Sequence, residues 1–557
     1  MDLSQKRAEV DKDVAHVEDN AEPGLFEKVG DGNALDEDIA YGSTGVRALF
    51  ESPYVTGAAA LASLGGFSFG YDQGVISIIL TMEQFLNVFP RARTPFGSSL
   101  MTSLLLLGAF VGCLLLPYAA DRISRKRAIV GCVAVFTVGA IIQTAAKDYT
   151  TISVGRAIGG LGTGSLALGA PLYISEIAPP NMRGTLLVFE SISIVSGVVI
   201  AFWITYGTRF IQSEASFRLP FALQIVPGLL LGLGILFFPF SPRWLALVGR
   251  NDECLASLSK LRALPTEDAR VQKEYQAIII EAEFQRVMQE RRHPGKQGLR
   301  LEALGWLDLF SRKMWRRMAV GIGISFFQQF MGINAFIYYA PTLFRQLGQS
   351  DELSLTLSGV FNILQLVTVF VCFFIIDKVG RKWLAIIGAA GTGLSYVVIA
   401  ILSGLYEKDW IHHTAAGWVC VTFAFLFILF FGVSYSPLGW ALPTEAFPTS
   451  VRSKGVALSN SIIWLSNFIV AIITPPLLES AGFGTYIFFA AFCGGALLWA
   501  IFLLPETKGR TLEEMDEVFG DTSGQEEQEI LDMQSILVKE SGDAYICSRI
   551  SGDFQDD

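Results

Sequence analysis

The chain has 557 residues, of which 52% are hydrophobic and only 17% are charged, and its mean hydropathy is +0.46. Because soluble domains carry about a quarter charged residues, this composition excludes a soluble globular protein of this size. The net charge of −10 is unevenly spread, since residues 1–50 carry −7, residues 506–557 carry −11 and the segment between them carries +8. The basic residues belong to this apolar segment, so we expect no nucleic-acid partner.

The seven cysteines and four histidines show no spacing typical of a metal site or of a disulfide framework. The sequence also shows no nucleophile–base arrangement and no phosphate-binding loop. We therefore expect neither a cofactor nor a metal, and we do not expect an enzyme. The first 50 residues have no basic stretch followed by an apolar one, so a cleavable signal peptide is not expected.

Twelve apolar stretches are each long enough to cross the hydrocarbon core of a bilayer, which takes about 20 residues. They lie at residues 54–77, 99–120, 128–146, 150–174, 185–207, 219–240, 316–340, 354–376, 383–405, 416–439, 454–475 and 483–504. The sequence therefore predicts an all-α membrane protein with twelve transmembrane helices. An even number of spans places both ends of the chain on the same side of the lipid bilayer.

Basic residues between the predicted spans indicate the orientation of the chain. The connection between spans 2 and 3 holds Arg122, Arg125 and Arg127, whereas connections on the opposite side are poorer in basic residues. Since basic residues are enriched in cytoplasmic loops, we expect both termini and the polar central segment in the cytoplasm, with the body in the plasma membrane. In the central segment, residues 254–262 and 269–292 carry apolar side chains at helical spacing, which predicts amphipathic helices.

The two halves of the apolar body carry matching motifs. Span 2 ends at Asp121 and span 8 at Asp377, and each acid is followed by basic residues. Spans 4 and 10 end at Glu176 and Glu445, and each glutamate is followed by an arginine seven residues later. With a third pair at the ends of spans 6 and 12, the offsets are 256, 269 and 266 residues. These nearly equal offsets indicate an internal duplication of six-helix halves.

Such a duplication is typical of a transporter whose substrate site lies between the two repeats. We therefore divide the chain into an acidic N-terminal tail, two six-helix halves with a helical linker between them, and an acidic C-terminal tail. The predicted boundaries, in that order, are residues 1–50, 51–242, 243–313, 314–505 and 506–557.

Several motifs within residues 50–520 identify a family resemblance. They are Phe69–Ser77 in span 1, Gly155–Arg156 in span 4, Pro171–Pro179 followed by Arg183, Gln328–Asn334 in span 7, and Pro505–Thr511 after span 12. Together they resemble the sugar-porter family of the major facilitator superfamily. The sequences of spans 5, 6 and 10 are similar to those of fungal monosaccharide–proton symporters. The resemblance implies the major facilitator fold and sugar transport.

Asp72 is an acid within an apolar span, which costs roughly 2.5–3.5 kcal/mol on insertion scales and marks a functional site by default. The alternative is an acid near a helix end that merely reaches water. A carboxyl group that alternates between an apolar and a charge-paired environment can take up a proton on one side and release it on the other. The resemblance implies that Arg156 stabilises ionised Asp72, and that protonation weakens this proton-coupling pair.

Gln328, Gln329 and Asn334 form a polar patch in span 7. Uncharged amides suit sugar hydroxyls because both groups donate and accept hydrogen bonds, although amides also hold membrane helices together. A helix break at Gly332 would help to present these side chains on one side. We expect further sugar contacts from aromatic and polar residues of other spans, namely Phe69, Ser191, Gln365, Trp440, Trp464 and Asn467.

The chain departs from the family pattern at several positions. Ser191 aligns where the family presents a glutamine to the sugar, and it follows an unusual acid, Glu190. The motif after span 2 has Pro117 and Ser124 where the family has glycine, and Phe240 stands in place of a glutamate. The first departure leaves the sugar preference open, and the others concern the cytoplasmic gate.

We expect gates at both ends of the site. Tyr338 and Tyr339 at the outer end of span 7 resemble the extracellular gate of the family. Charged residues recur at matching positions on the cytoplasmic side of both halves. They predict a salt-bridge latch that holds the outward-open state. The alternative is that the basic residues only anchor the chain with its positive side in the cytoplasm. The latch residues are Asp121, Arg125, Glu176, Arg183, Arg243, Asp377, Arg381, Glu445 and Arg452.

The leading interpretation is import of a monosaccharide together with a proton, by a monomer that needs only the sugar, protons and the bilayer. The sugar is glucose or another hexose, or xylose. A sugar sensor that signals without transport, and a facilitator that moves sugar without protons, are the alternatives. A disaccharide such as sucrose is an alternative substrate, and Glu190 leaves the status of polyols and sugar acids open.

Overall fold

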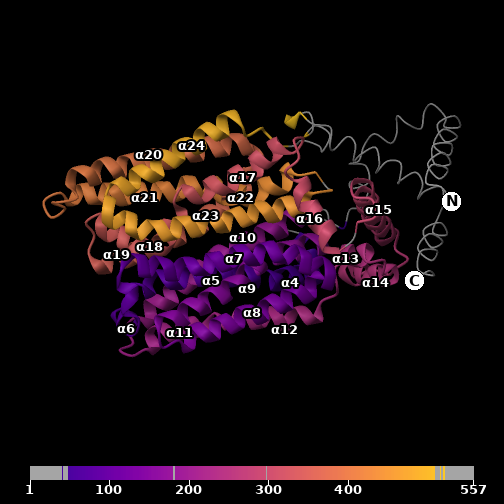
Figure 1. Cartoon of the computed structure of the whole chain (residues 1–557), viewed down its shortest axis with the longest axis horizontal. Coiled ribbons are helices and arrows are strands. Elements are labelled where there is room, and N and C mark those ends of the chain that lie inside the picture. Colours follow the sequence, from indigo (N-terminus) through magenta and orange to yellow (C-terminus); the bar gives the residue numbers. More distant parts are fainter. Residues whose placement is uncertain are drawn as a thin grey trace.

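The computed structural model describes residue 41, residues 48–179, 182–296, 298–448 and 450–508, residue 515 and residues 518–520. Within these residues every regular element is an α-helix or a 3-10 helix, so the all-α prediction is confirmed. The helices run along the long axis of an elongated bundle (Figure 1).

The first half of the chain forms one group of helices, shown in indigo and magenta in Figure 1. Its long helices are α4 (Pro53–Ala62), α5 (Leu64–Ile79), α7 (Pro95–Ile123), α8 (Arg125–Ala145), α9 (Tyr149–Ile177), α10 (Arg183–Thr208), α11 (Ala215–Leu223) and α12 (Ile225–Gly234). The shorter elements are α3 (Ala48–Glu51), α6 (Glu83–Val88), η3 (Pro90–Arg93) and η5 (Ile235–Phe237).

The second half forms a similar group, shown in orange and yellow. It consists of α17 (Trp315–Phe330), α18 (Ile333–Gln346), α19 (Asp351–Val379), α20 (Arg381–Tyr406), α21 (Thr414–Val433), α22 (Tyr435–Ala446), α23 (Arg452–Ala481) and α24 (Gly484–Phe502). The two groups meet where α7 packs against α23, α10 against α19, and α5 against α18.

Four helices connect the two groups and lie together at one end of the bundle (Figure 1). They are α13 (Pro242–Leu247), α14 (Asn251–Arg262), α15 (Ala269–Arg292) and α16 (Gly298–Asp308). The helices predicted at residues 254–262 and 269–292 correspond to α14 and α15. Burial raises the pKa of the Cys254 thiol in α14 to about 12, so this thiol is unreactive near neutral pH. We call this end of the bundle the linker end and the opposite one the far end.

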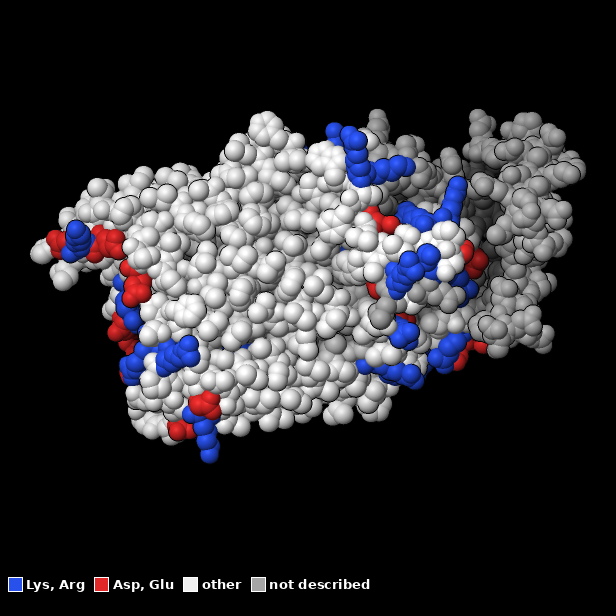
Figure 2. Space-filling view, viewed as in Figure 1, with Lys and Arg blue, Asp and Glu red and all other residues white. Residues whose placement is uncertain are grey.

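Eleven helical segments among the described residues are long and apolar enough to cross a membrane. They correspond to predicted spans 2–12. The first predicted span is present as α4 and α5, which are separated at Ser63, and it is not among the eleven. This segment holds five glycines and an acid, so it is less apolar than the others. On the face seen in Figure 2, Lys, Arg, Asp and Glu side chains gather at the two ends and leave the middle uncharged.

Glycines bring α5 and α10 close together. A Cβ atom added at Gly70 would lie 1.8 Å from the carbonyl oxygen of Ile194, and one added at Gly74 would lie 2.3 Å from that of Val198. Small residues allow this approach between membrane helices. The contact matters for function because both helices border the space between the halves.

The internal duplication is also visible in the backbone. Ser124 ends α7 with φ 90° and ψ 152°, and Gly380 ends α19 at the matching place with φ 98° and ψ 154°. The next helix begins directly after each of these residues. The two halves therefore use the same sharp turn, although only the second has a glycine there.

Candidate functional site

A cavity lies between the two halves, and all nine predicted sugar-contacting residues line it. It has a volume of about 80 Å³. Phe69 on α5 and Ser191 on α10 come from the first half, whereas the amides of α17 and α18 and the tryptophans of α22 and α23 come from the second. Tertiary structure thus brings together residues that are up to 398 positions apart, from Phe69 to Asn467.

The amides of the seventh predicted span form a hydrogen-bonded chain. Asn334 donates to Gln329, Gln329 Nε2 donates to Gln328 Oε1 at 3.2 Å, and Gln328 Nε2 donates to the Tyr435 carbonyl oxygen at 3.0 Å. The predicted break is present, because Gly332 has φ 87° and separates α17 from α18. The break turns the amides toward one cavity, which a continuous helix would not do with residues five apart.

Aromatic residues close one wall of the cavity. The rings of Phe69 and Trp464 meet edge to face across the two halves, with centroids 4.7 Å apart. Trp440 lines the same cavity from α22. Aromatic faces next to amides provide both an apolar surface and hydroxyl partners, the combination found in ligand pockets with a few placed polar groups.

Tyr338 joins the two halves beside the cavity. Its hydroxyl accepts hydrogen bonds from Gln73 Nε2 on α5 at 2.9 Å and from Asn467 Nδ2 on α23 at 3.3 Å. Tyr339 donates to the Ala471 carbonyl oxygen at 3.0 Å. Gln73 also lines the cavity and was not predicted from the sequence, although its spacing of four from Phe69 places both on one face of a helix.

Asp72 and Arg156 form a fully buried ion pair within the first half. Arg156 Nη1 lies 3.2 Å from Asp72 Oδ1, and the two side chains are 1% and 0% exposed. Arg156 Nε also donates to the Met101 carbonyl oxygen, whereas Asp72 Oδ2 has no hydrogen-bond partner in the described part of the chain. Asp72 directly precedes the cavity residue Gln73, so the acid is adjacent to the cavity without lining it.

Comparisons with known proteins identify the family of this chain. Residues 58–519 match the family model described as "Sugar (and other) transporter". The chain belongs to this sugar-transporter family. It is 32% identical over 484 residues to the high-affinity glucose transporter of Kluyveromyces lactis, covering 83% of this chain and 84% of that one.

Two further relatives support the same assignment. The sugar transporter STL1 of Saccharomyces cerevisiae is 32% identical over 476 residues, which cover 82% of this chain and 80% of that protein. A solved structure of the proton:xylose symporter XylE, bound to 6-bromo-6-deoxy-D-glucose, matches with a TM-score of 0.69 and 26% identity, covering 84% of this chain and 99% of that one. The protein is therefore a sugar transporter with the major facilitator fold, and not an enzyme.

The predicted latch residues of the transporter lie at the linker end. Arg125 pairs with Glu176 and with Asp121, each at 2.8 Å. Arg381 pairs with Glu445 at 3.0 Å. These pairs each join helices of the same half, so they do not themselves tie one half of the transporter to the other.

The remaining latch residues have other partners. Arg243 in α13 pairs with Glu281 of α15 at 2.6 Å, and Arg452 Nε donates to the Phe447 carbonyl oxygen at 3.2 Å. The side chains of Arg183 and Asp377 lie outside the described residues. The latch stays a prediction.

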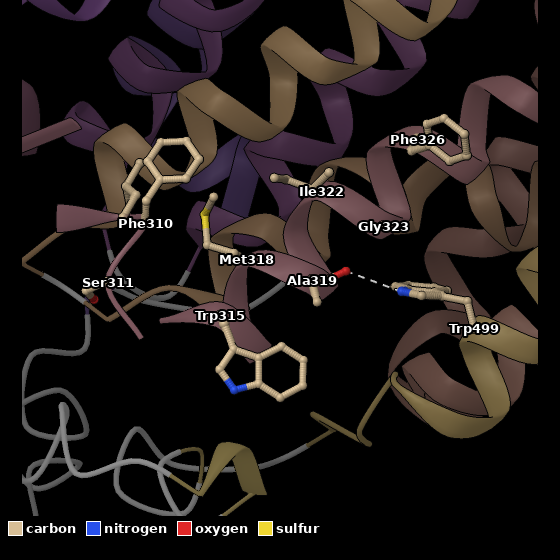
Figure 3. Close-up of a pocket in the computed structure, with 10 residues that line it drawn as sticks. Phe310, Ser311, Trp315, Met318, Ala319, Ile322, Gly323, Phe326 and Trp499 are labelled. Carbon is tan, nitrogen blue, oxygen red and sulfur yellow. Dashed lines mark hydrogen bonds between the residues drawn. The ribbon is translucent and has the colours of Figure 1, made fainter. Parts of the chain in front are cut away.

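The transporter also has a larger pocket, of about 390 Å³, between residues 309–311, which follow α16, and the helices α17 and α24. Figure 3 shows that Trp315, Met318, Ile322 and Phe326 surround it, and that Trp499 Nε1 donates to the Ala319 carbonyl oxygen. Its lining is almost entirely apolar. A sugar needs several hydrogen-bond partners, so the smaller central cavity is the better candidate for the sugar site.

Proposed function

We propose that this sugar transporter imports a monosaccharide together with a proton across the plasma membrane by alternating access. The observation that carries the proposal is the position of the central cavity, which lies between two repeated halves and beside the buried Asp72–Arg156 pair. The substrate is glucose or another hexose, or xylose. This choice is supported by the amide chain of Gln328, Gln329 and Asn334 and by the aromatic surface of Trp440 and Trp464.

Asp72 and Arg156 are the proposed proton-coupling pair. A buried carboxylate is costly unless a cation pairs with it, so Arg156 favours the ionised form of Asp72 in this conformation. Protonation of Asp72 removes the attraction and frees Arg156. One proton that crosses about 100 mV supplies about 2.3 kcal/mol, and at about 1.36 kcal/mol per factor of ten this supports roughly fifty-fold accumulation of sugar.

The linker end is proposed to face the cytoplasm, with both termini on that side. The basic connections of the chain support this orientation. Tyr338, held by Gln73 and Asn467, then belongs to the extracellular gate, and the charged residues of the linker end form the cytoplasmic latch. Sugar enters when the far end opens and leaves when the linker end opens.

The test is uptake of labelled glucose by yeast that lacks its own hexose carriers, with an external pH electrode and unlabelled competitors. Addition of glucose is expected to make the medium more alkaline, and uptake is expected to rise as external pH falls, because the proton is a co-substrate. Asp72→Asn is expected to lower the alkalinisation per glucose, because it removes one carboxyl group that binds a transported proton. A competitor panel of hexoses, xylose, sucrose and a sugar acid ranks the substrates.

Other outcomes favour the alternatives. Glucose uptake without any proton movement by the unchanged chain would identify a facilitator. Failure to take up any member of the panel, with the protein at the cell surface, would favour a sugar sensor. Preferential uptake of sucrose would replace the monosaccharide by a disaccharide.

A further inference from the structure

Glu190 is a second buried acid in the membrane-spanning part of the transporter. It lies on α10, is 4% exposed, and neither of its carboxyl oxygens has a hydrogen-bond partner among the described residues. Asp72, by contrast, is paired with Arg156. An unpaired carboxylate in an apolar environment is too costly to persist, so the contacts of Glu190 are those of an uncharged acid.

The carboxyl group of Glu190 lies in the contact between α5 and α10. On α10, Ile194 and Val198 follow Glu190 at intervals of four and pack on Gly70 and Gly74 of α5. The carboxyl group takes the same position one turn earlier, against Gly66, where an added Cβ would lie 2.4 Å from Oε1 of Glu190. The carboxyl group of Glu190 thus fills the space that a side chain at position 66 would occupy.

Among the side chains that the structure describes, no cation binds Glu190. The elements packed against α10 are α4, α5, α9, α11 and α19. Their titratable or charged residues are Tyr54 on α4; Tyr71 and Asp72 on α5; Tyr149, Arg156, Tyr173 and Glu176 on α9; Arg218 on α11; and Asp351, Glu352, Cys372, Asp377 and Lys378 on α19. None of those with described side chains bonds to Glu190.

Glu190 lies next to the sugar cavity and closer to the linker end than Asp72. Its neighbour Ser191 lines the cavity, as does Ile194. On α5, its contact residue Gly66 precedes Asp72 by six residues, which corresponds to about 9 Å along a helix at 1.5 Å per residue. Opening of the linker end would therefore bring water to the α5–α10 contact on the side where Glu190 lies.

We propose that Glu190 is a second proton-binding site of the transport cycle, protonated in the conformation described here and deprotonated when the linker end opens. The inference rests on the proposed proton symport and deepens it. The carboxylate takes one proton from water on the far side and releases one proton to water at the linker end. Because Asp72 pairs with Arg156 whereas Glu190 has no hydrogen-bond partner among the described residues, they act as separate sites, and two protons accompany each sugar.

The experiment counts protons and sugar in the same liposomes. The purified full chain is reconstituted with a pH-sensitive dye inside, and a gradient of labelled glucose drives transport. The unchanged chain is expected to move two protons per glucose, and Glu190→Gln is expected to move one. Ser193→Ala, which removes the bond from Ser193 Oγ to the Ser63 carbonyl oxygen in the same helix contact, is the matched control and is expected to keep the ratio of two.

Two further measurements separate a proton site from a structural role. Glucose exchange without a proton gradient is expected to persist in Glu190→Gln, which establishes that the variant folds and binds sugar. If it does not, Glu190→Leu, which places an apolar side chain against Gly66, is expected to exchange glucose and to move one proton per glucose in the counting assay. The infrared carbonyl band of a protonated carboxylic acid is expected in the unchanged chain and is expected to weaken in either variant.

The outcomes are distinguishable from failure of the proposed function. A ratio of one proton per glucose in the unchanged chain overturns the role of Glu190 while proton symport stands. A ratio of two that persists in Glu190→Gln overturns it as well. No proton movement in the unchanged chain refutes proton symport itself, and the proposal for Glu190 falls with it.

Discussion

Ser124 holds a backbone conformation that glycine adopts at lower cost. Its φ of 90° and ψ of 152° lie in a region that is essentially restricted to glycine and that costs other residues about 1–3 kcal/mol. Gly380 occupies the matching turn of the second half with φ 98°. Ser124 partly offsets the strain, because its side chain accepts a hydrogen bond from the backbone nitrogen of Arg127 at 3.2 Å.

We predict that Ser124→Gly raises the stability of the transporter. Relief of the strain should exceed the loss of the cap, which costs only a few tenths of a kcal/mol when serine becomes glycine, so the free energy of unfolding should rise by about 1 kcal/mol or more. Thermal unfolding of the purified protein, followed by tryptophan fluorescence, measures the change. Ser124→Ala keeps the strain and loses the cap, so it should unfold at a lower temperature than the unchanged chain. A lower unfolding temperature for Ser124→Gly would contradict the prediction.

At the scale of elements, the packing of α5 on α10 depends on glycines that have no room for a side chain. A Cβ atom at Gly70 would lie 1.8 Å from the Ile194 carbonyl oxygen, which is backbone and cannot rotate away. A Cβ atom at Gly57 in α4 would meet nothing within 4 Å. The two positions therefore form a matched pair for substitution.

Gly70→Ala is expected to force α5 and α10 apart. Overpacking of this kind costs about 1–3 kcal/mol or more, and both helices carry cavity residues, so sugar uptake should fall with stability. Gly57→Ala should leave both unchanged or slightly improved, because alanine favours a helix by up to about 1 kcal/mol over glycine. Unfolding temperature and glucose uptake at equal surface expression test the pair. Equal behaviour of the two variants would argue against close packing at Gly70.

At the scale of the whole molecule, an ion pair between Arg209 and Glu352 joins the two halves at the far end. Arg209 Nη2, just after α10, lies 2.6 Å from Glu352 Oε2 at the start of α19. The arginine side chain is 13% exposed and lies over the rings of Tyr206 and Phe210, whereas Glu352 is 71% exposed. This pair must break when the far end opens.

Reversal of one charge should favour the state that is open at the far end. A pair with an exposed partner contributes about 0.2–1 kcal/mol, so Glu352→Arg should shift the equilibrium by about fivefold or more once repulsion is added. The double variant Arg209→Glu with Glu352→Arg should restore the closed state. The distance between spin labels at Gln212 and Asp351 reports the shift. This distance should lengthen in the single variant only. Equal distances in the single and double variants would contradict the prediction.

The apolar spans and the family of the chain followed from local sequence. Hydropathy over about 20 residues decides whether a helix can lie in lipid, and it depends on neighbouring residues only. This is why eleven of the twelve predicted spans recur as single candidate segments. The linker helices α14 and α15 were predicted for a similar reason, since a helix carries its amphipathic spacing within its own sequence.

Tertiary structure decided which side chains meet. Helical spacing alone did not bring Gln328 and Asn334 to one side, whereas the positive φ of Gly332 does. The contacts of Tyr338 with Gln73, and of Arg209 with Glu352, join residues more than 140 positions apart. Their energies depend on distances between helices of different halves, and no pattern along one helix determines how two halves pack. For the same reason, only the packing of α5 on α10 shows that the acid at position 190 has no hydrogen-bond partner in the described part of the chain.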